Sequence, residues 1–156
     1  ELCKLYERIY DLPVTICRFY NVYGDFMPTE GEYRTVLSIF LEQYRSGEPI
    51  TVTGDGEQRR DFTHVDDIVD AMMKVVQLNK WGSVYELGRG ENHSINEVAE
   101  MFRFGDFSHD ILPIKYIDSI PGEARNTLCK SELARKKLNW NPTINLKDWI
   151  TEEINK

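Results

Sequence analysis

The sequence of 156 residues is long enough for one domain with a hydrophobic core, and 41% of its residues are hydrophobic, an ordinary share for a globular protein. Its formal net charge of -7, with acidic and basic residues interspersed, argues against a broad basic face for nucleic acid or a membrane surface. No apolar stretch has the length of a membrane span. The cysteines, Cys3, Cys17 and Cys129, show no CxxC spacing, so we expect reduced thiols in a cytoplasmic protein.

The first part of the chain predicts a helix, a strand and a long loop before a second helix. Apolar residues follow helical spacing through residues 1–11, and the sequence begins inside that pattern, which indicates a cut N-terminus. Residues 14–19 are rich in β-branched side chains, so we expect a strand buried on both faces between two neighbours. Residues 20–34 predict a loop of a length that often carries function. Helical spacing returns over 35–46, and Gly47 predicts the helix end.

The middle of the chain predicts one strand before a helix and one strand after it. A strand over 50–53 precedes a glycine turn over 54–56, where positive φ is permitted. Either Asp66 or Asp67 can cap the helix that follows. A second strand is expected over 83–87. The apolar stripe of the helix is expected to comprise Val65, Ile68, Val69, Met72, Met73 and Val76.

The last part of the chain predicts shorter elements around an irregular segment at 103–113. Ser94 and Glu97 have the spacing of a capping box in front of an apolar helix. A strand is expected over 114–117, and Ser131 and Asn145 can cap two further helices. The alternation of strands and helices predicts an α/β fold with mainly parallel pairing.

Asn21 is the first candidate for a ligand contact. It follows the expected strand at 14–19, and ligands of open α/β sheets bind beyond the carboxyl ends of strands. Its amide can donate to a phosphate or sugar oxygen and accept from a hydroxyl. The alternative, that Asn21 only closes an Asx turn, stays open at this point.

Arg59 and Arg60 form the second candidate. Adjacent side chains of an extended backbone point in different directions, so at most one of the two faces a given cleft. A guanidinium suits a diphosphate because its planar fork donates two parallel charge-assisted hydrogen bonds. Asp61 is then expected to orient the arginine. The alternative is a solvated cluster of surface ion pairs.

Other patterns favour structural roles. Gly88-Arg-Gly90 follows a strand, but His93 stands where a dinucleotide fingerprint has its third glycine, so we expect a tight turn. The histidines have no metal-ligand spacing with one another or with the cysteines, so no metal site is predicted. The acidic balance also opposes RNA binding.

Seven collinear segments resemble the signatures of one family, the extended short-chain dehydrogenase/reductases that act on nucleotide-diphosphate sugars. One match would be weak, whereas seven in the same order are strong. The segments are Glu1–Tyr6, Leu12–Val14, Arg18–Gly24, Gly54–Gly56 with Arg60–Asp67, Tyr85–Gly88, Pro121–Glu123 and Leu138–Pro142.

The resemblance implies the C-terminal fragment of a Rossmann-type extended short-chain dehydrogenase/reductase. Residues 25–156 would form the substrate-binding lobe, and residues 1–24 the last helix and strand of the NAD-binding half, in one folding unit. The family binds NAD in that half and a nucleotide-diphosphate sugar in the lobe. By analogy, Tyr20 would lie by the nicotinamide, Asn21 and Arg60 would hold the diphosphate, and the backbone near Val52 and Thr53 would flank the base.

Two further residues are candidates for the same pocket. Asn92 lies in the loop after Gly90. Arg125 follows the Pro-Gly-Glu segment, and the family often has a nucleotide-binding arginine just before that segment. Ile120 stands there in this sequence, so Arg125 is a possible substitute.

The resemblance also implies what this chain does not contain. The family's catalytic Tyr-x-x-x-Lys pair would fall before Glu1, and no tyrosine of the sequence has a lysine four positions on. We therefore expect no catalytic residue, no bound NAD and no activity in this polypeptide alone. An epimerase fragment is the main hypothesis, and the alternatives are a 4,6-dehydratase fragment or a non-catalytic binding or interaction module. We also expect a homo-oligomer, because the strand at 14–19 would lack neighbours.

Overall fold

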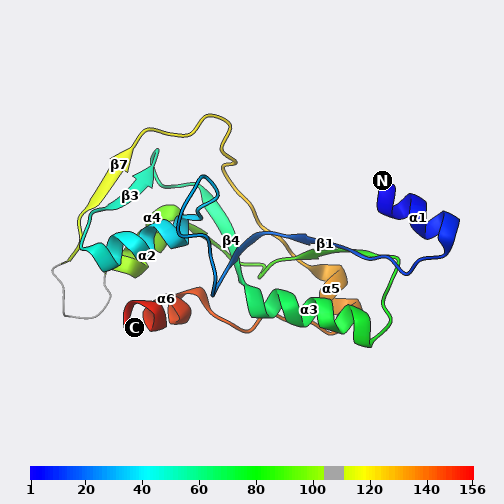
Figure 1. The fold of residues 1–156 in the computed structure, drawn as a ribbon. Helices are drawn as coiled ribbons and strands as arrows, with labels where there is room; N and C mark the ends of the chain where they lie inside the picture. Colours follow the sequence, from blue (N-terminus) through cyan, green and yellow to red (C-terminus); the bar gives the residue numbers. More distant parts are fainter. Residues whose placement is uncertain (104–110) are drawn as a thin grey trace.

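The structure, a computed structural model, describes residues 1–103 and 111–156 (Figure 1). The helices are α1 (Leu2–Tyr10), α2 (Val36–Ser46), α3 (Val65–Gln77), α4 (Ile95–Arg103), α5 (Glu132–Leu138) and α6 (Leu146–Ile154). The strands are β1 (Ile16–Phe19), β2 (Asn21–Tyr23), β3 (Ile50–Thr53), β4 (Arg59–His64), β5 (Val84–Leu87), β6 (Asn92–Ser94) and β7 (Ile114–Ile117). Most of the segment expected to be irregular lies outside the described residues. None of these six helices is long and apolar enough to cross a membrane.

The strands form small sheets in which parallel pairing dominates. β1 pairs with β5, β3 with β7 and β2 with β4, all in parallel, whereas β6 joins β4 antiparallel. This arrangement confirms the predicted α/β class. Only Tyr20 separates β1 from β2, so the chain passes directly from one sheet into the next. The loop expected from residue 20 therefore begins after Tyr23, because main-chain pairing with β4 makes residues 21–23 a strand.

The buried side chains form two hydrophobic cores. The larger core lies among α2, α4, α6 and β3, where Phe40 and Phe102 meet edge to face with ring centroids 5.8 Å apart. The smaller core lies among α3, α5 and β5, around the fully buried Trp140. In Figure 1 the helices of the larger core, α2, α4 and α6, lie to the left, those of the smaller core, α3 and α5, lie to the right, and β4 lies between the two groups. The connection from β1 through β2 therefore joins the two cores.

The strand expected over residues 14–19 forms as β1, and the expectation that it would lack neighbours is confirmed on one of its edges among the described residues, whereas the expected burial of both faces is not found. Within the described part of the chain β1 pairs on one side only, with β5. Arg18 is exposed, and 49% of the surface of Phe19 is exposed to solvent. A run of β-branched residues predicts a strand from composition, but composition does not report what packs against each of its faces.

The helix expected after Asp66 forms as α3, with a different buried face. Ile68, Ala71 and Val75 are buried in the smaller core. Four residues of the predicted stripe are instead exposed: Val69, Met72, Met73 and Val76. The helix is apolar on two sides, so periodicity alone could not indicate which side meets the core.

Two of the predicted helix caps form as expected. The main-chain N–H of Glu97 donates to Ser94 Oγ at 3.0 Å, and that of Ser94 donates to Glu97 Oε2 at 3.1 Å. This reciprocal pair is the capping box that the spacing predicts. The Asn145 side chain accepts from the N–H of Lys147 at 2.9 Å and caps α6.

Two other predicted caps are wrong. The cap of α3 is His64, whose Nδ1 accepts from the N–H of Asp66, and neither Asp66 nor Asp67 serves as the cap. Ser131 precedes α5 without a side-chain cap bond. Its hydroxyl instead donates to the carbonyl of Gly88 and accepts from the Gly88 N–H. Ser131 therefore bonds a residue far along the chain, whereas α3 is capped by the residue that directly precedes it.

Candidate functional site

A cavity of about 400 Å³ lies between the start of α2, the strands β2 and β4, and the ends of β3 and β7. Thr53 and Ile117 are the last residues of the parallel strands β3 and β7, and both line it. The cavity therefore lies where parallel sheets bind ligands, beyond the carboxyl ends of strands. Its polar lining consists of Asn21, Arg34, Thr35, Thr51, Thr53, Arg60 and Glu123.

Asn21 lines this cavity from the first position of β2. Its amide nitrogen donates to the carbonyl of Asp61 at 3.1 Å and to Thr127 Oγ1 at 3.4 Å. These partners lie far along the chain, whereas an Asx turn bonds two residues on, so the Asx-turn alternative does not describe this side chain. Because both bonds use the nitrogen, the amide oxygen is the atom that can accept from a ligand hydroxyl.

Arg60 lines the same cavity from β4, and its side chain is only 11% exposed. One guanidinium nitrogen donates to Glu123 Oε1 at 2.7 Å, and the other donates to the carbonyls of Arg59 and Ala124. Arg60 is thus held in an ion pair whose partner also lines the cavity. These three bonds leave two of the five guanidinium N–H donors for a ligand.

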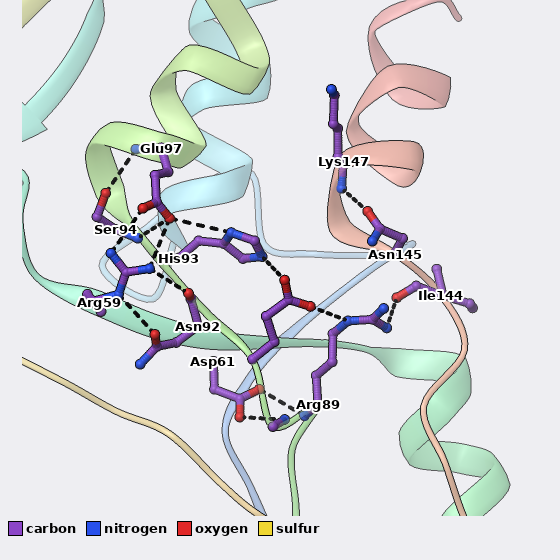
Figure 2. Close-up of polar contacts among 12 residues, drawn as sticks. Arg59, Asp61, Arg89, Asn92, His93, Ser94, Glu97, Ile144, Asn145 and Lys147 are labelled. Atoms are coloured by element: carbon purple, nitrogen blue, oxygen red, sulfur yellow. Dashed lines mark hydrogen bonds and ion pairs between the residues drawn. The ribbon is translucent and has the colours of Figure 1, made fainter.

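Arg59 points away from the cavity, which confirms that only one of the adjacent arginines faces it. Figure 2 shows the Arg59 guanidinium bonded to Glu97, at 3.0 and 3.1 Å, and to Asn92. Asn92 Oδ1 accepts from Arg59, while its nitrogen donates to Asn126 Oδ1 and to the carbonyl of Thr127. The structure therefore brings Asn92 to Arg59 and not to the cavity lining.

Asp61 does not orient Arg60, contrary to the expectation from the sequence. Its carboxylate is fully buried and accepts the main-chain N–H groups of Arg89, Gly90 and Cys129 at 2.8 to 3.0 Å. Figure 2 shows Asp61 beside the main chain of the turn at Arg89. The amides of Arg89 and Gly90 thus bond Asp61 and the amide of Gly88 bonds Ser131, so none of the three is available to a pyrophosphate. This confirms the turn as a structural feature.

Arg125 is engaged outside the cavity. Its guanidinium donates two hydrogen bonds to the Asp55 carboxylate, at 2.7 and 2.9 Å, on the exposed turn after β3. These bonds lower the pKa of Asp55 to about 2 and raise the pKa of Arg125. Ile120 lines the cavity, but Arg125 does not, so the structure does not bring Arg125 to the position of a substitute.

The remaining candidates, Val52, Thr53 and Tyr20, differ in whether they reach the cavity. The Val52 side chain is fully buried in the larger core, while Thr53 reaches the cavity. Thr53 Oγ1 and its carbonyl both accept from Gln58 Nε2, which holds the end of β3 in place. Tyr20 lies at the junction of β1 and β2 and does not line the cavity. Burial raises the pKa of the Tyr20 hydroxyl.

Sequence reasoning missed the start of α2. Thr35 caps this helix by accepting from the Ser38 N–H at 3.3 Å, and both Arg34 and Thr35 line the cavity. A helix N-terminus carries a partial positive charge and is favourable for anions. The available signal was an arginine followed by a capping threonine at the end of a long glycine-containing loop.

The cavity thus combines arginines, a helix N-terminus and apolar walls, a combination suited to an anionic ligand with an apolar part. A family model described as the NAD dependent epimerase/dehydratase family matches residues 1–88. The chain belongs to the NAD-dependent epimerase/dehydratase family. Among the residues that the structure describes, no group of three His, Cys, Asp or Glu side chains could hold a metal ion.

Known members of the epimerase/dehydratase family resemble this chain over its whole length. An uncharacterized UDP-glucose epimerase of Bacillus subtilis (strain 168) is 30% identical over 99% of this chain and 47% of its own length. The crystal structure of a UDP-glucose 4-epimerase from Thermotoga maritima with UDP-glucose superposes with a TM-score of 0.86 at 27% identity, covering 97% of this chain and 48% of that chain.

A third relative carries both a sugar nucleotide and NAD. The UDP-glucuronic acid 4-epimerase of Bacillus cereus, solved with UDP-glucuronic acid and NAD, matches with a TM-score of 0.82 at 27% identity. The match covers 99% of this chain and 48% of that one. This chain therefore spans about half the length of the family members that it matches.

Proposed function

We propose that this chain binds the nucleoside diphosphate of a sugar nucleotide for an NAD-dependent epimerase, in the cavity that Asn21 and Arg60 line. One observation carries the proposal: Asn21 and Arg60, to which the family resemblance assigns the ligand, border the same cavity beside the ends of β3 and β7, where Arg60 has donors for phosphate and the Asn21 amide oxygen can accept from a hydroxyl. The cavity volume of about 400 Å³ falls within the range of small-molecule sites.

The lining offers a different surface to each part of such a ligand. Arg60 has unused guanidinium donors for phosphate oxygens, and the α2 N-terminus adds a favourable partial charge. The apolar side chains of Val36, Phe62 and Ile117 supply walls against which a base can pack. Thr53 and Asn21 add polar groups for the hydroxyl and carbonyl groups of the ligand.

Two of the relatives solved with a sugar nucleotide support a UDP-sugar as the ligand and an epimerase as the family reaction in this proposal. The Thermotoga maritima and Bacillus cereus structures were solved with UDP-glucose and UDP-glucuronic acid, and both proteins are described as 4-epimerases. NAD is part of this proposal for the family reaction, in which it would accept and return a hydride. Within this chain, Tyr20 is the one residue that we propose to contact NAD.

Self-association and a cytoplasmic location belong to the same proposal. The apolar faces of α1 and α3 are exposed, and covering such surface favours association. The three cysteines are all free thiols, which agrees with a reducing compartment.

Isothermal titration calorimetry with UDP-glucose, dTDP-glucose and GDP-mannose tests the binding function. We expect UDP-glucose to bind and the Arg60→Gln variant to lose about tenfold or more in affinity, because a charge-assisted bond to phosphate is removed. Arg59→Gln is the matched control, because Arg59 lies next in sequence and points away from the cavity. No heat with any of the three ligands at millimolar concentration would refute the proposal.

A further inference from the structure

The charged side chains that line the cavity determine how much of the negative charge of a bound diphosphate is neutralised. Two cationic side chains, Arg34 and Arg60, and one anionic side chain, Glu123, line it. Glu123 lies 2.7 Å from the Arg60 guanidinium and offsets that positive charge. A diphosphate brings two ionised phosphate groups, so Arg60 alone leaves the bound ligand with uncompensated negative charge.

Arg34 supplies the positive charge that Glu123 does not offset. It directly precedes Thr35, the cap of α2, so its charge adds to that of the helix N-terminus. Its guanidinium donates to Glu42 Oε2 at 2.8 Å, and Glu42 does not line this cavity. The cavity wall at position 120 is apolar, so its cations come from the α2 side and from β4.

The ion pair of Arg34 can be exchanged at little cost. The side chains of Arg34 and Glu42 are 38% and 56% exposed, and exposed pairs of this kind contribute little to stability. Glu42 would return to water on release, whereas an arginine gains two parallel charge-assisted bonds on a phosphate. A diphosphate is therefore the stronger competitor for the Arg34 guanidinium.

We infer that Arg34 is a second diphosphate-binding residue of this cavity and leaves Glu42 when the nucleotide binds. The inference rests on the proposed function of the cavity and names a residue that sets its preference for charged ligands. Arg34 discriminates between nucleoside diphosphates and uncharged nucleosides, because its contribution depends on phosphate charge.

The test compares UDP with uridine on the 156-residue chain and its variants. Arg34→Gln is expected to weaken UDP binding about tenfold, because it removes a charge-assisted contact, and to leave uridine binding unchanged. Uridine affinity thus reports that the cavity is intact in each variant. Arg45→Gln is the matched control, since Arg45 also lies on α2 but pairs with Glu153 beside a different cavity.

A charge-replacement variant makes the test more specific. Ile120 is exposed and lines the same cavity, so an arginine there can restore a cation. We expect Ile120→Arg in the Arg34→Gln background to recover UDP affinity and to increase its dependence on salt.

The outcomes separate this inference from the proposed function. UDP binding that survives Arg34→Gln within twofold, while Arg60→Gln weakens it about tenfold or more, overturns the role of Arg34 and leaves the proposed function standing. A wild-type chain that binds uridine and UDP equally overturns both. Equal losses of UDP and uridine affinity in Arg34→Gln assign Arg34 to the structure of the cavity and also overturn the inference.

Discussion

Three consecutive residues of β4 have three different environments. Arg59 bonds Glu97 on one side of the strand, Arg60 lines the cavity on the other, and Asp61 accepts three main-chain N–H groups inside the protein. Alternation along a strand predicts the separation of the two arginines. It could not predict the partners of Asp61, because Arg89 and Cys129 lie far along the chain and offer main-chain groups that no sequence pattern marks.

The pair of Asp55 and Arg125 carries a pH dependence. The hydrogen bonds from Arg125 lower the pKa of Asp55 to about 2 from its ordinary value of 3.8. Because the folded-state pKa is the lower one, the pair stabilises the fold above about pH 3.8, and this contribution is lost as the pH falls toward 2. We expect Arg125→Gln to raise the pKa of Asp55 toward 3.8 without changing the affinity for UDP-glucose.

Carboxyl-carbon NMR titration measures this pKa directly. A wild-type Asp55 midpoint near 3.8 would show that Arg125 does not hold the carboxylate. A loss of UDP-glucose affinity in Arg125→Gln would instead show that Arg125 contributes to ligand binding.

At the scale of elements, the sequence predicted which segments form helices and strands better than which side chains they bury. The strands β3, β5 and β7 and the capped helices α4 and α6 form where spacing and capping residues indicate. The buried face of α3 and the exposure of β1 depend on which elements lie next to them, and that information is tertiary. The family resemblance predicted some of the residues that line the cavity, such as Asn21 and Arg60. The positions of Arg34 and Glu123 in its lining could be found only from the structure.

The turn after β3 holds the end of that strand against α4. A Cβ at Gly56, where φ is +72°, would lie 2.7 Å from Val52 Cγ1 and would also clash with Asn96 on α4. Gly47 has a similar φ of +68° with nothing within 4 Å of an added Cβ. We expect Gly47→Ala to cost about 1 kcal/mol from backbone strain, and Gly56→Ala about 1 to 3 kcal/mol more from overpacking.

Urea unfolding of the two variants gives their free energies of unfolding on one scale. The matched φ values cancel the backbone contribution in the comparison. Equal losses for the two variants would mean that the turn does not pack against α4 as the structure describes.

At the scale of the whole molecule, exposed apolar surface gathers on α1 and α3. Leu2, Ile9 and Tyr10 on α1 are each more than half exposed, and Val76 on α3 is 53% exposed. Exposed apolar patches of this kind are the basis on which we propose self-association. In Figure 1 α1 projects from the end of the molecule beyond β1.

The mass of the particle in solution tests this association. We expect light scattering on a sizing column to give a mass above the 18.3 kDa of one chain, rising with concentration. Met72→Glu with Val76→Glu should shift the protein toward the monomer, whereas Gln77→Glu on the same helix should not. A single-chain mass at every concentration would contradict self-association.

One cavity, between the start of α2 and the ends of β3 and β7, is proposed to receive the nucleoside diphosphate. Amide chemical-shift changes on titration with UDP-glucose report the binding place directly. We expect the largest changes at Val36, Thr53 and Arg60, with saturation at a single affinity. Changes confined to the β1 and β5 sheet, or no saturable change anywhere, would contradict this placement of the ligand.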